Sequence, residues 1–139
     1  MLVDTGAWYA LADRSDRHHR AALAFYRTEA PRARLFTTDL ILAESFTLLA
    51  AHLGRASAIR FWDGLRVARI PVLPAEPVDV ESAWRIAQGF PDQDFSVADC
   101  VSFAMMERLG VHEAFAFDAH FLVYRFGPRR TRSFQRWPA

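Results

Sequence analysis

The sequence predicts an α/β fold, a three-layer sandwich with a central, mainly parallel sheet, formed by one domain over residues 1–139. Short apolar stretches of strand length alternate along the chain with longer stretches of helical periodicity. Strands that are separated by helices pair in parallel through right-handed crossovers, which places helices on both faces of the sheet. A chain of 139 residues is long enough for one core of this kind and too short for two.

The first half of the chain contains three predicted strands and four predicted helices. The strands are short apolar stretches at residues 1–4, 34–37 and 70–73. The helices carry apolar residues at spacings of three and four, at residues 5–13, 16–30, 39–52 and 56–69. Asp16 is a suitable N-cap for the second helix, Pro31 ends it, and Gly54 ends the third.

The second half begins after Pro74 and Pro77 with a predicted helix over residues 78–88, followed by a polar loop over 89–96. The strongest helical pattern in the chain comes next, at residues 97–109, and Gly110 caps its end. The remaining predicted elements are a strand at 113–117 and an edge strand at 131–135.

Four acidic residues border or interrupt the apolar stretches: Asp4, Glu44, Asp99 and Asp118. Acidic side chains are rarely buried unless they are paired or bind a metal. Asp4 and Asp118 are each the first polar residue after a predicted strand, so both are expected at the carboxyl edge of the sheet, where ligands bind in parallel α/β folds. Glu44 shares a helical stripe with Ile41 and Leu48 and is expected to face inward near the same edge.

Clustered carboxylates repel one another unless a cation compensates their charge, so the sequence predicts a metal site with a catalytic role. Ligands that are all oxygen favour Mg²⁺ or Mn²⁺ over zinc. Asp4 and Asp99 are assigned as direct ligands, with Asp118 and Glu44 binding through metal waters or acting as base. Local alternatives remain open, because Ser96 and Asp99 form a capping-box pattern and both Asp4 and Asp118 suit turns or N-caps.

The cations of this chain are unusual, because all 17 are arginine. From residue 119 onward there are five arginines and no acid, and a basic segment of this kind suits a polyanion. The candidate residues for contact with a polyanion in this segment are Arg125, Arg129, Arg130 and Arg132. The alternative is a solvated tail with no ligand. The single cysteine, Cys100, lies in an apolar helical stretch and is expected to be a buried structural thiol. No long uncharged apolar stretch or leader pattern is present, so neither a membrane span nor secretion is expected, and the predicted location is the cytoplasm.

The order of the acidic motifs resembles PIN domains of the VapC toxin type, over essentially the whole chain. The resemblance rests on four segments in sequence order: Leu2–Gly6, Thr37–Thr38 followed by Glu44, Asp94–Met106 and Ala116–Phe121. It implies a metal-dependent endoribonuclease that acts as the toxin of a toxin–antitoxin pair. The metal-site acids that it implies are Asp4, Glu44, Asp99 and Asp118, supported by Asp94, Thr5 and Ser96.

The resemblance also implies a cognate antitoxin, which would bind a groove between the first helices, and a homodimer. One departure is Ala116, which stands where many relatives have a hydroxyl residue two positions before the last aspartate. For His120 a structural role is favoured over a contact with phosphate. A PIN-fold scaffold without catalytic activity is the main alternative. A phosphoacceptor domain or a P-loop is disfavoured, because each needs a lysine and the chain has none.

Overall fold

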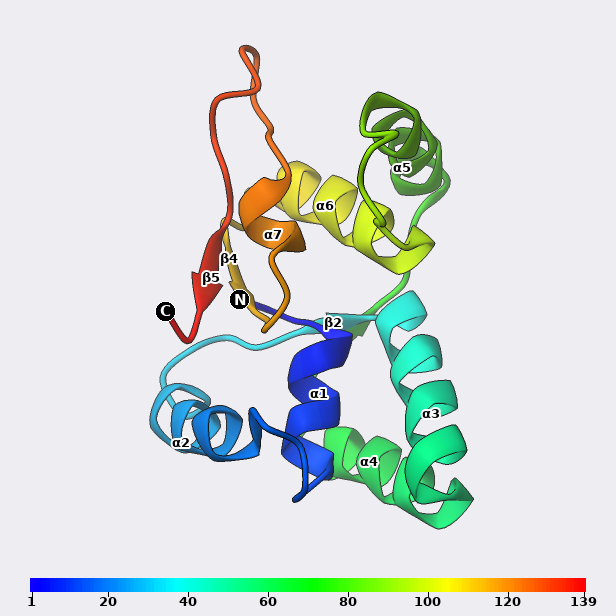
Figure 1. The fold of residues 1–139 in the computed structure, drawn as a ribbon, viewed down its shortest axis with the longest axis vertical. Coiled ribbons are helices and arrows are strands. Elements are labelled where there is room, and N and C mark those ends of the chain that lie inside the picture. Colours follow the sequence, from blue (N-terminus) through cyan, green and yellow to red (C-terminus); the bar gives the residue numbers. More distant parts are fainter.

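The computed structural model describes all 139 residues and confirms the predicted α/β fold with a parallel sheet (Figure 1). Three strands pair in parallel in the order β1-β4-β5: Leu2–Val3, Glu113–Phe115 and Gln135–Trp137. Two further strands, β2 (Thr37–Thr38) and β3 (Val72–Leu73), form a second parallel pair. A parallel bridge between Leu2 and Phe36 joins β1 to the residue before β2.

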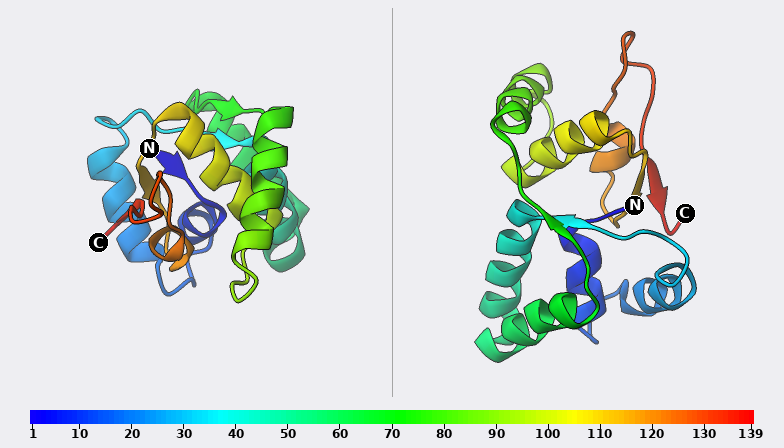
Figure 2. Two further views of the ribbon diagram at one scale, coloured as in Figure 1. Left: turned by 90° about the horizontal axis from the view of Figure 1, so that it is seen from above. Right: turned by 180° about the vertical axis from the view of Figure 1, so that it is seen from behind.

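Seven helices surround the strands: α1 (Thr5–Ala12), α2 (His19–Glu29), α3 (Asp39–Leu53), α4 (Arg55–Val67), α5 (Pro77–Gly89), α6 (Val97–Leu109) and α7 (His120–Val123). Helices α1, α2 and α4 lie on one side of the strands, and α5, α6 and α7 lie on the other (Figures 1 and 2). This arrangement is the three-layer sandwich that the alternating pattern predicted. No helix combines the length and apolar character needed to cross a membrane.

Aromatic side chains fill the core on the α6 and α7 side. Phe103 of α6 stacks on Tyr124 with ring centroids 4.5 Å apart, and Phe134 stacks on Phe126 at the same distance. On the opposite face, Phe25 of α2 packs against Phe115 of β4 at 4.7 Å. The sheet is therefore covered on both faces, as a parallel sheet requires.

Several predicted boundaries were wrong. Helix α2 begins at His19 rather than residue 16, because the Asp16 carboxylate accepts a hydrogen bond from the His18 amide and closes a turn before the helix. Strand β2 is two residues long, so most of the predicted stretch 34–37 precedes it. Strand β5 comprises 135–137, whereas the prediction was 131–135. The four-residue helix α7 was not predicted, because it is too short to show periodicity.

Candidate active site

The predicted acidic residues converge on one cavity of about 300 Å³ beyond the ends of β1 and β4. Its lining comprises all four predicted metal-site acids, the three predicted supporting residues and three others: Asp4, Glu44, Asp99, Asp118, Asp94, Thr5, Ser96, Gly6, Leu48 and His120. These residues come from four separate stretches of the chain, which parallel pairing brings to one edge. Their roles in catalysis remain predictions.

Asp4 is the most enclosed acid of this cavity, with 4% of its surface exposed. It follows β1 directly and is the N-cap of α1, where its Oδ2 accepts a hydrogen bond from the Gly6 amide at 3.4 Å. Burial raises the pKa of the Asp4 carboxyl well above its usual range, and the neighbouring charges of Asp118 and Asp99 raise it further. Asp4 therefore caps α1 and also lines the acidic cavity.

Asp99 also serves two purposes. It closes the predicted capping box at the start of α6: the Ser96 amide donates to Asp99 Oδ2 at 2.9 Å, and the Asp99 amide donates to Ser96 Oγ at 3.0 Å. The same Oδ2 lies 2.8 Å from His120 Nδ1. Burial raises the pKa of the Asp99 carboxyl, although these hydrogen bonds oppose the rise.

Glu44 lies at the mouth of the cavity and is exposed, so the prediction that it faces the interior was wrong. Ile41 and Ser45 take the buried positions on this part of α3. Thr5 Oγ1 donates a short hydrogen bond of 2.6 Å to Glu44 Oε2, which holds the carboxylate over the cavity. Asp94 is exposed at the same mouth.

His120 lies in the cavity lining, although the sequence analysis favoured a structural role for it over a contact with phosphate. The His120 amide donates to Asp118 Oδ1 at 2.9 Å, and its imidazole contacts Asp99. Potential ligand atoms of Asp99, Asp118 and His120 lie within 4.8 Å of one another. One feature of the sequence could have indicated this position. His120 comes two residues after the strand-end Asp118 and begins the next helix, which places it beside that aspartate.

The donors of this cavity fit a divalent cation. Asp4 and Asp99 are buried carboxylates, and no arginine forms a salt bridge with either of them. Asp99 contacts the His120 imidazole, whereas Asp4 has no basic side chain in contact with it. A buried acid without a cationic partner is costly, and a bound metal ion would remove that cost. The five carboxylates of the lining, those of Asp4, Glu44, Asp94, Asp99 and Asp118, match the preference of Mg²⁺ and Mn²⁺ for oxygen ligands.

The predicted RNA-binding arginines do not line this cavity. Arg125 Nη1 donates to carbonyls at the end of α7, including those of Val123 and Tyr124 at 3.2 Å, and the Arg132 guanidinium lies 4.9 Å from the centre of the Phe126 ring. The turn that carries Arg129 and Arg130 projects from the body, far from the start of α1 along the long axis (Figure 1).

A different basic segment contacts the β4–α7 connection that carries Asp118. His18, in the connection between α1 and α2, stacks on Phe117 with ring centroids 4.4 Å apart and planes 13° from parallel. Phe117 directly precedes Asp118. Arg17 Nε donates to His18 Nε2 at 3.0 Å, so the α1–α2 connection, which also carries Arg14, contacts the residue before Asp118 through His18.

A separate apolar cavity of about 270 Å³ lies between α1, α2 and α4. Its lining is mainly aliphatic and aromatic and includes Trp8, Leu11, Leu23, Tyr26, Phe61 and Leu65. The cavity lies in the region of the first helices where an antitoxin-binding groove was predicted, and its role in binding a partner stays a prediction.

Comparison with known proteins gives a consistent assignment. The PIN-domain family matches residues 1–127. The 23S rRNA-specific endonuclease VapC20 of Mycobacterium tuberculosis, from strains CDC 1551 and H37Rv, is 29% identical over 127 residues, which cover 91% of this chain and 95% of the relative. The crystal structure of VapC20, described as a sarcin-ricin loop cleaving toxin, superimposes with a TM-score of 0.77 at 28% identity, over 85% of this chain and 89% of VapC20. The chain therefore belongs to the PIN-domain family and is homologous to VapC20.

Proposed function

We propose that this PIN-domain nuclease is a Mg²⁺- or Mn²⁺-dependent endoribonuclease that acts in the cytoplasm as the toxin of a toxin–antitoxin pair. The observation that carries the proposal is the convergence of four carboxylates on one cavity, two of them buried without an arginine partner. Neither a scaffold nor a simple set of helix caps needs that arrangement.

Asp4, Asp99 and Asp118 are the residues that would hold the metal, with Glu44 acting through a water or as base. A bound divalent cation would lower the pKa of a water and neutralise charge on the phosphodiester. The other residues of the cavity hold these ligands in place: Thr5 fixes Glu44, while Ser96 and His120 fix Asp99 Oδ2.

The homology supports RNA as the substrate, and we propose ribosomal RNA as the first class to test. VapC20 is named for cleavage of 23S rRNA, and the similarity to it extends over 91% of this chain. The proposed substrate is therefore a structured stem-loop whose phosphodiester would reach the open mouth of the cavity beside Glu44 and Asp94.

The decisive experiment compares wild type with Asp118→Asn, which keeps the shape of the side chain and removes its charge. With Mn²⁺, wild type is expected to cleave 23S rRNA and to arrest growth when expressed alone. Asp118→Asn should slow cleavage by at least about 100-fold, the upper figure for disturbing groups that merely support a metal ligand. Asp63→Asn, an exposed change on α4, is the matched control and should cleave like wild type.

Two outcomes would count against this function. Equal cleavage rates for wild type and a folded Asp118→Asn variant would make Asp118 structural. If wild type cleaves neither rRNA nor short single-stranded RNA with either metal, the scaffold alternative is correct.

Two basic surfaces are candidates for contact with the RNA backbone. If Arg129 and Arg130 contact phosphates, replacing both with alanine should weaken binding to all RNA sequences and flatten the salt dependence by about one unit of slope per lost contact. The same change at Arg14 and Arg17 is the matched comparison, because these residues belong to the connection beside Phe117. If replacing one of these pairs leaves the salt dependence of RNA binding unchanged, that pair lies on a solvated surface and does not contact the RNA.

The apolar cavity between α1, α2 and α4 supports an antitoxin partner. An amphipathic segment could insert apolar side chains beside Trp8, Tyr26 and Phe61. A homodimer remains a prediction, for which the exposed Val80 and Trp84 on α5 offer an apolar surface.

A further inference from the structure

We propose that Arg136 of β5 is a positioning residue for Asp118, an inference that rests on the metal-dependent function proposed above. Arg136 Nη1 donates hydrogen bonds to the carbonyl oxygen of Phe117 at 2.9 Å and to that of Asp118 at 3.0 Å. These two peptide groups belong to the connection between β4 and α7. A single side chain, 18 residues away in sequence, therefore holds the backbone from which the Asp118 carboxylate projects.

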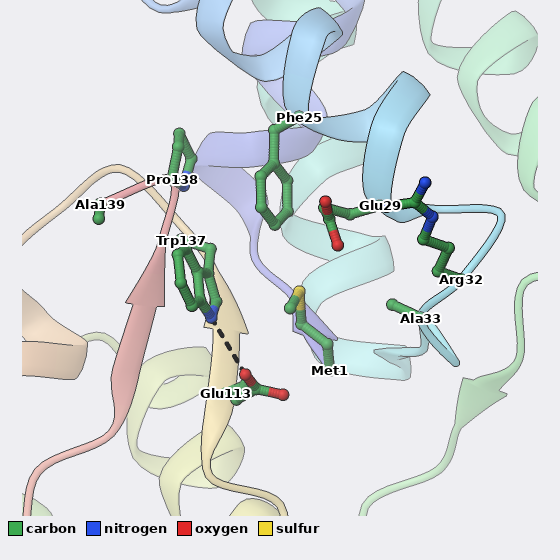
Figure 3. Close-up of a pocket in the computed structure, with 9 residues that line it drawn as sticks. All are labelled: Met1, Phe25, Glu29, Arg32, Ala33, Glu113, Trp137, Pro138 and Ala139. Atoms are coloured by element: carbon green, nitrogen blue, oxygen red, sulfur yellow. Dashed lines mark hydrogen bonds between the residues drawn. The ribbon is translucent and has the colours of Figure 1, made fainter.

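Strand β5 is anchored so that Arg136 reaches this connection. Trp137 pairs with Phe115 of β4, and its carbonyl accepts a hydrogen bond from the Ala116 amide at 3.0 Å. The Trp137 side chain lies beside Phe25, with ring centroids 6.3 Å apart, and its Nε1 donates to Glu113 at 3.2 Å (Figure 3). Because neighbouring residues of a strand point to opposite faces, Arg136 lies on the other face, toward α7.

The hydrogen bonding of Arg136 is not that of an ordinary ion pair. Its guanidinium forms no salt bridge, and its Nε is buried without a hydrogen-bond partner. A buried unpaired donor is destabilising, so packing alone does not account for an arginine at this position. Both bonds that the guanidinium does make go to the segment that carries Asp118.

Asp118 is thus held at two points. The His120 amide fixes its Oδ1 at 2.9 Å, and Arg136 fixes its backbone carbonyl. Residues 1–127 match the family, so the second of these restraints comes from a part of the chain beyond that match. Loss of a group that orients a metal ligand typically weakens metal affinity or activity by about 10–100-fold.

The test measures Mn²⁺ affinity by calorimetry and RNA cleavage in Arg136→Met, which keeps the apolar stem and removes the donors. We expect Mn²⁺ binding at least about 10-fold weaker than wild type and a lower kcat, with KM for RNA within about twofold. Raising Mn²⁺ should restore part of the rate. Arg136→Lys, which retains a cation and a donor, should lie between the two proteins and provides a second test if Arg136→Met unfolds.

Two control variants separate positioning from folding or charge. Gln135→Met changes an exposed neighbour on β5, and Arg27→Met removes one exposed arginine from α2; both should bind Mn²⁺ like wild type. Wild-type Mn²⁺ affinity and kcat in folded Arg136→Met and Arg136→Lys would overturn the inference. If wild type itself binds no Mn²⁺, the proposed function fails first, which is a different result.

Discussion

Two neighbouring helices begin with the same local motif and place it in opposite electrostatic settings. Asp79 in α5 and Asp99 in α6 are each the third residue of their helix, and each completes a capping box by accepting a hydrogen bond from the N-cap amide. Both are buried, with 1% and 7% of their surfaces exposed. The difference lies in the other side chains that surround each carboxylate.

Asp79 faces an arginine. Arg108 Nε donates to its Oδ1 at 2.7 Å and Nη2 donates to its Oδ2 at 2.8 Å, and this pair lowers the pKa of the Asp79 carboxyl. Asp99 instead shares its cavity with Asp4 and Asp118, and burial raises the pKa of its carboxyl despite the contact with the His120 imidazole. Asp79 therefore has an arginine as its partner within the chain, whereas Asp99 contacts the His120 imidazole and lies among further acids, where the proposed cation would bind.

The largest effect should come from breaking the ion pair between Arg108 and Asp79. Arg108→Met leaves Asp79 buried without its cation, and we expect a loss of about 3 kcal/mol in the free energy of unfolding, the lower end of the usual range because Arg108 is one-third exposed. Urea denaturation measures it. Arg85→Met removes the exposed pair with Glu81 and should cost less than about 0.5 kcal/mol. Equal losses in the two variants would show that the Asp79 pair contributes no more than a surface contact.

The next largest effect concerns Asp99, which has no arginine partner. The proposed metal site exists only in the folded chain, so Mn²⁺ at 100 times its dissociation constant should raise the free energy of unfolding by about 2.7 kcal/mol. Asp99→Asn retains a hydrogen-bond acceptor for the Ser96 amide and should lose most of this gain, as followed by thermal melts with and without Mn²⁺. Asp79→Asn makes the same chemical change in α5 and should keep it. A full gain in Asp99→Asn would leave Asp99 as a helix cap alone.

The smallest effect is the pH dependence of the metal-free protein, and it has opposite signs at the two sites. Asp79 has a lowered pKa, so its stabilisation is present above the unfolded value of about 3.9 and is lost as the pH falls through the folded value. Asp99 has a raised pKa, so the folded state binds its proton more tightly and stability falls as the pH rises from about 4 through the folded value.

Urea midpoints measured in chelator between pH 4 and 7 test this difference. Asp99→Asn should reduce the decline in stability toward neutral pH, by about 1.4 kcal/mol for each unit by which the Asp99 pKa is raised. Asp79→Asn should leave that decline in place. A decline that is unchanged in Asp99→Asn would assign it to Asp4 instead.

The two capping boxes also show what could be predicted from sequence. The helix starts and the acidic positions after strands were predictable, because caps and strand ends are local patterns and parallel pairing brings strand ends to one edge. The local pattern around Asp99 left a simple helix cap open as an alternative, and it was the order of the acidic motifs that placed Asp99 with the other acids. Which side chains surround Asp99 depends on which helix packs beside it, which is a property of the tertiary structure.

The failures have the same physical origin. Glu44 was expected to face inward because its spacing matched Ile41, yet it lies at the cavity mouth, where Thr5 can reach it. His120 and Arg136 were not predicted as site residues, because their contacts join segments that are 18 to 21 residues apart. The position of the arginines after α7 depends on how far their turn projects, which composition does not encode.

The reaction rate of the single thiol of the chain can report how often the start of α6 opens. Cys100 follows Asp99, is 2% exposed, and burial raises its pKa to about 11, so a thiol reagent can react only when the start of this helix opens. The rate of modification therefore reports how often the segment that bears Asp99 leaves its native position. Because the sequence has no other cysteine, the signal comes from one atom next to the candidate metal ligand.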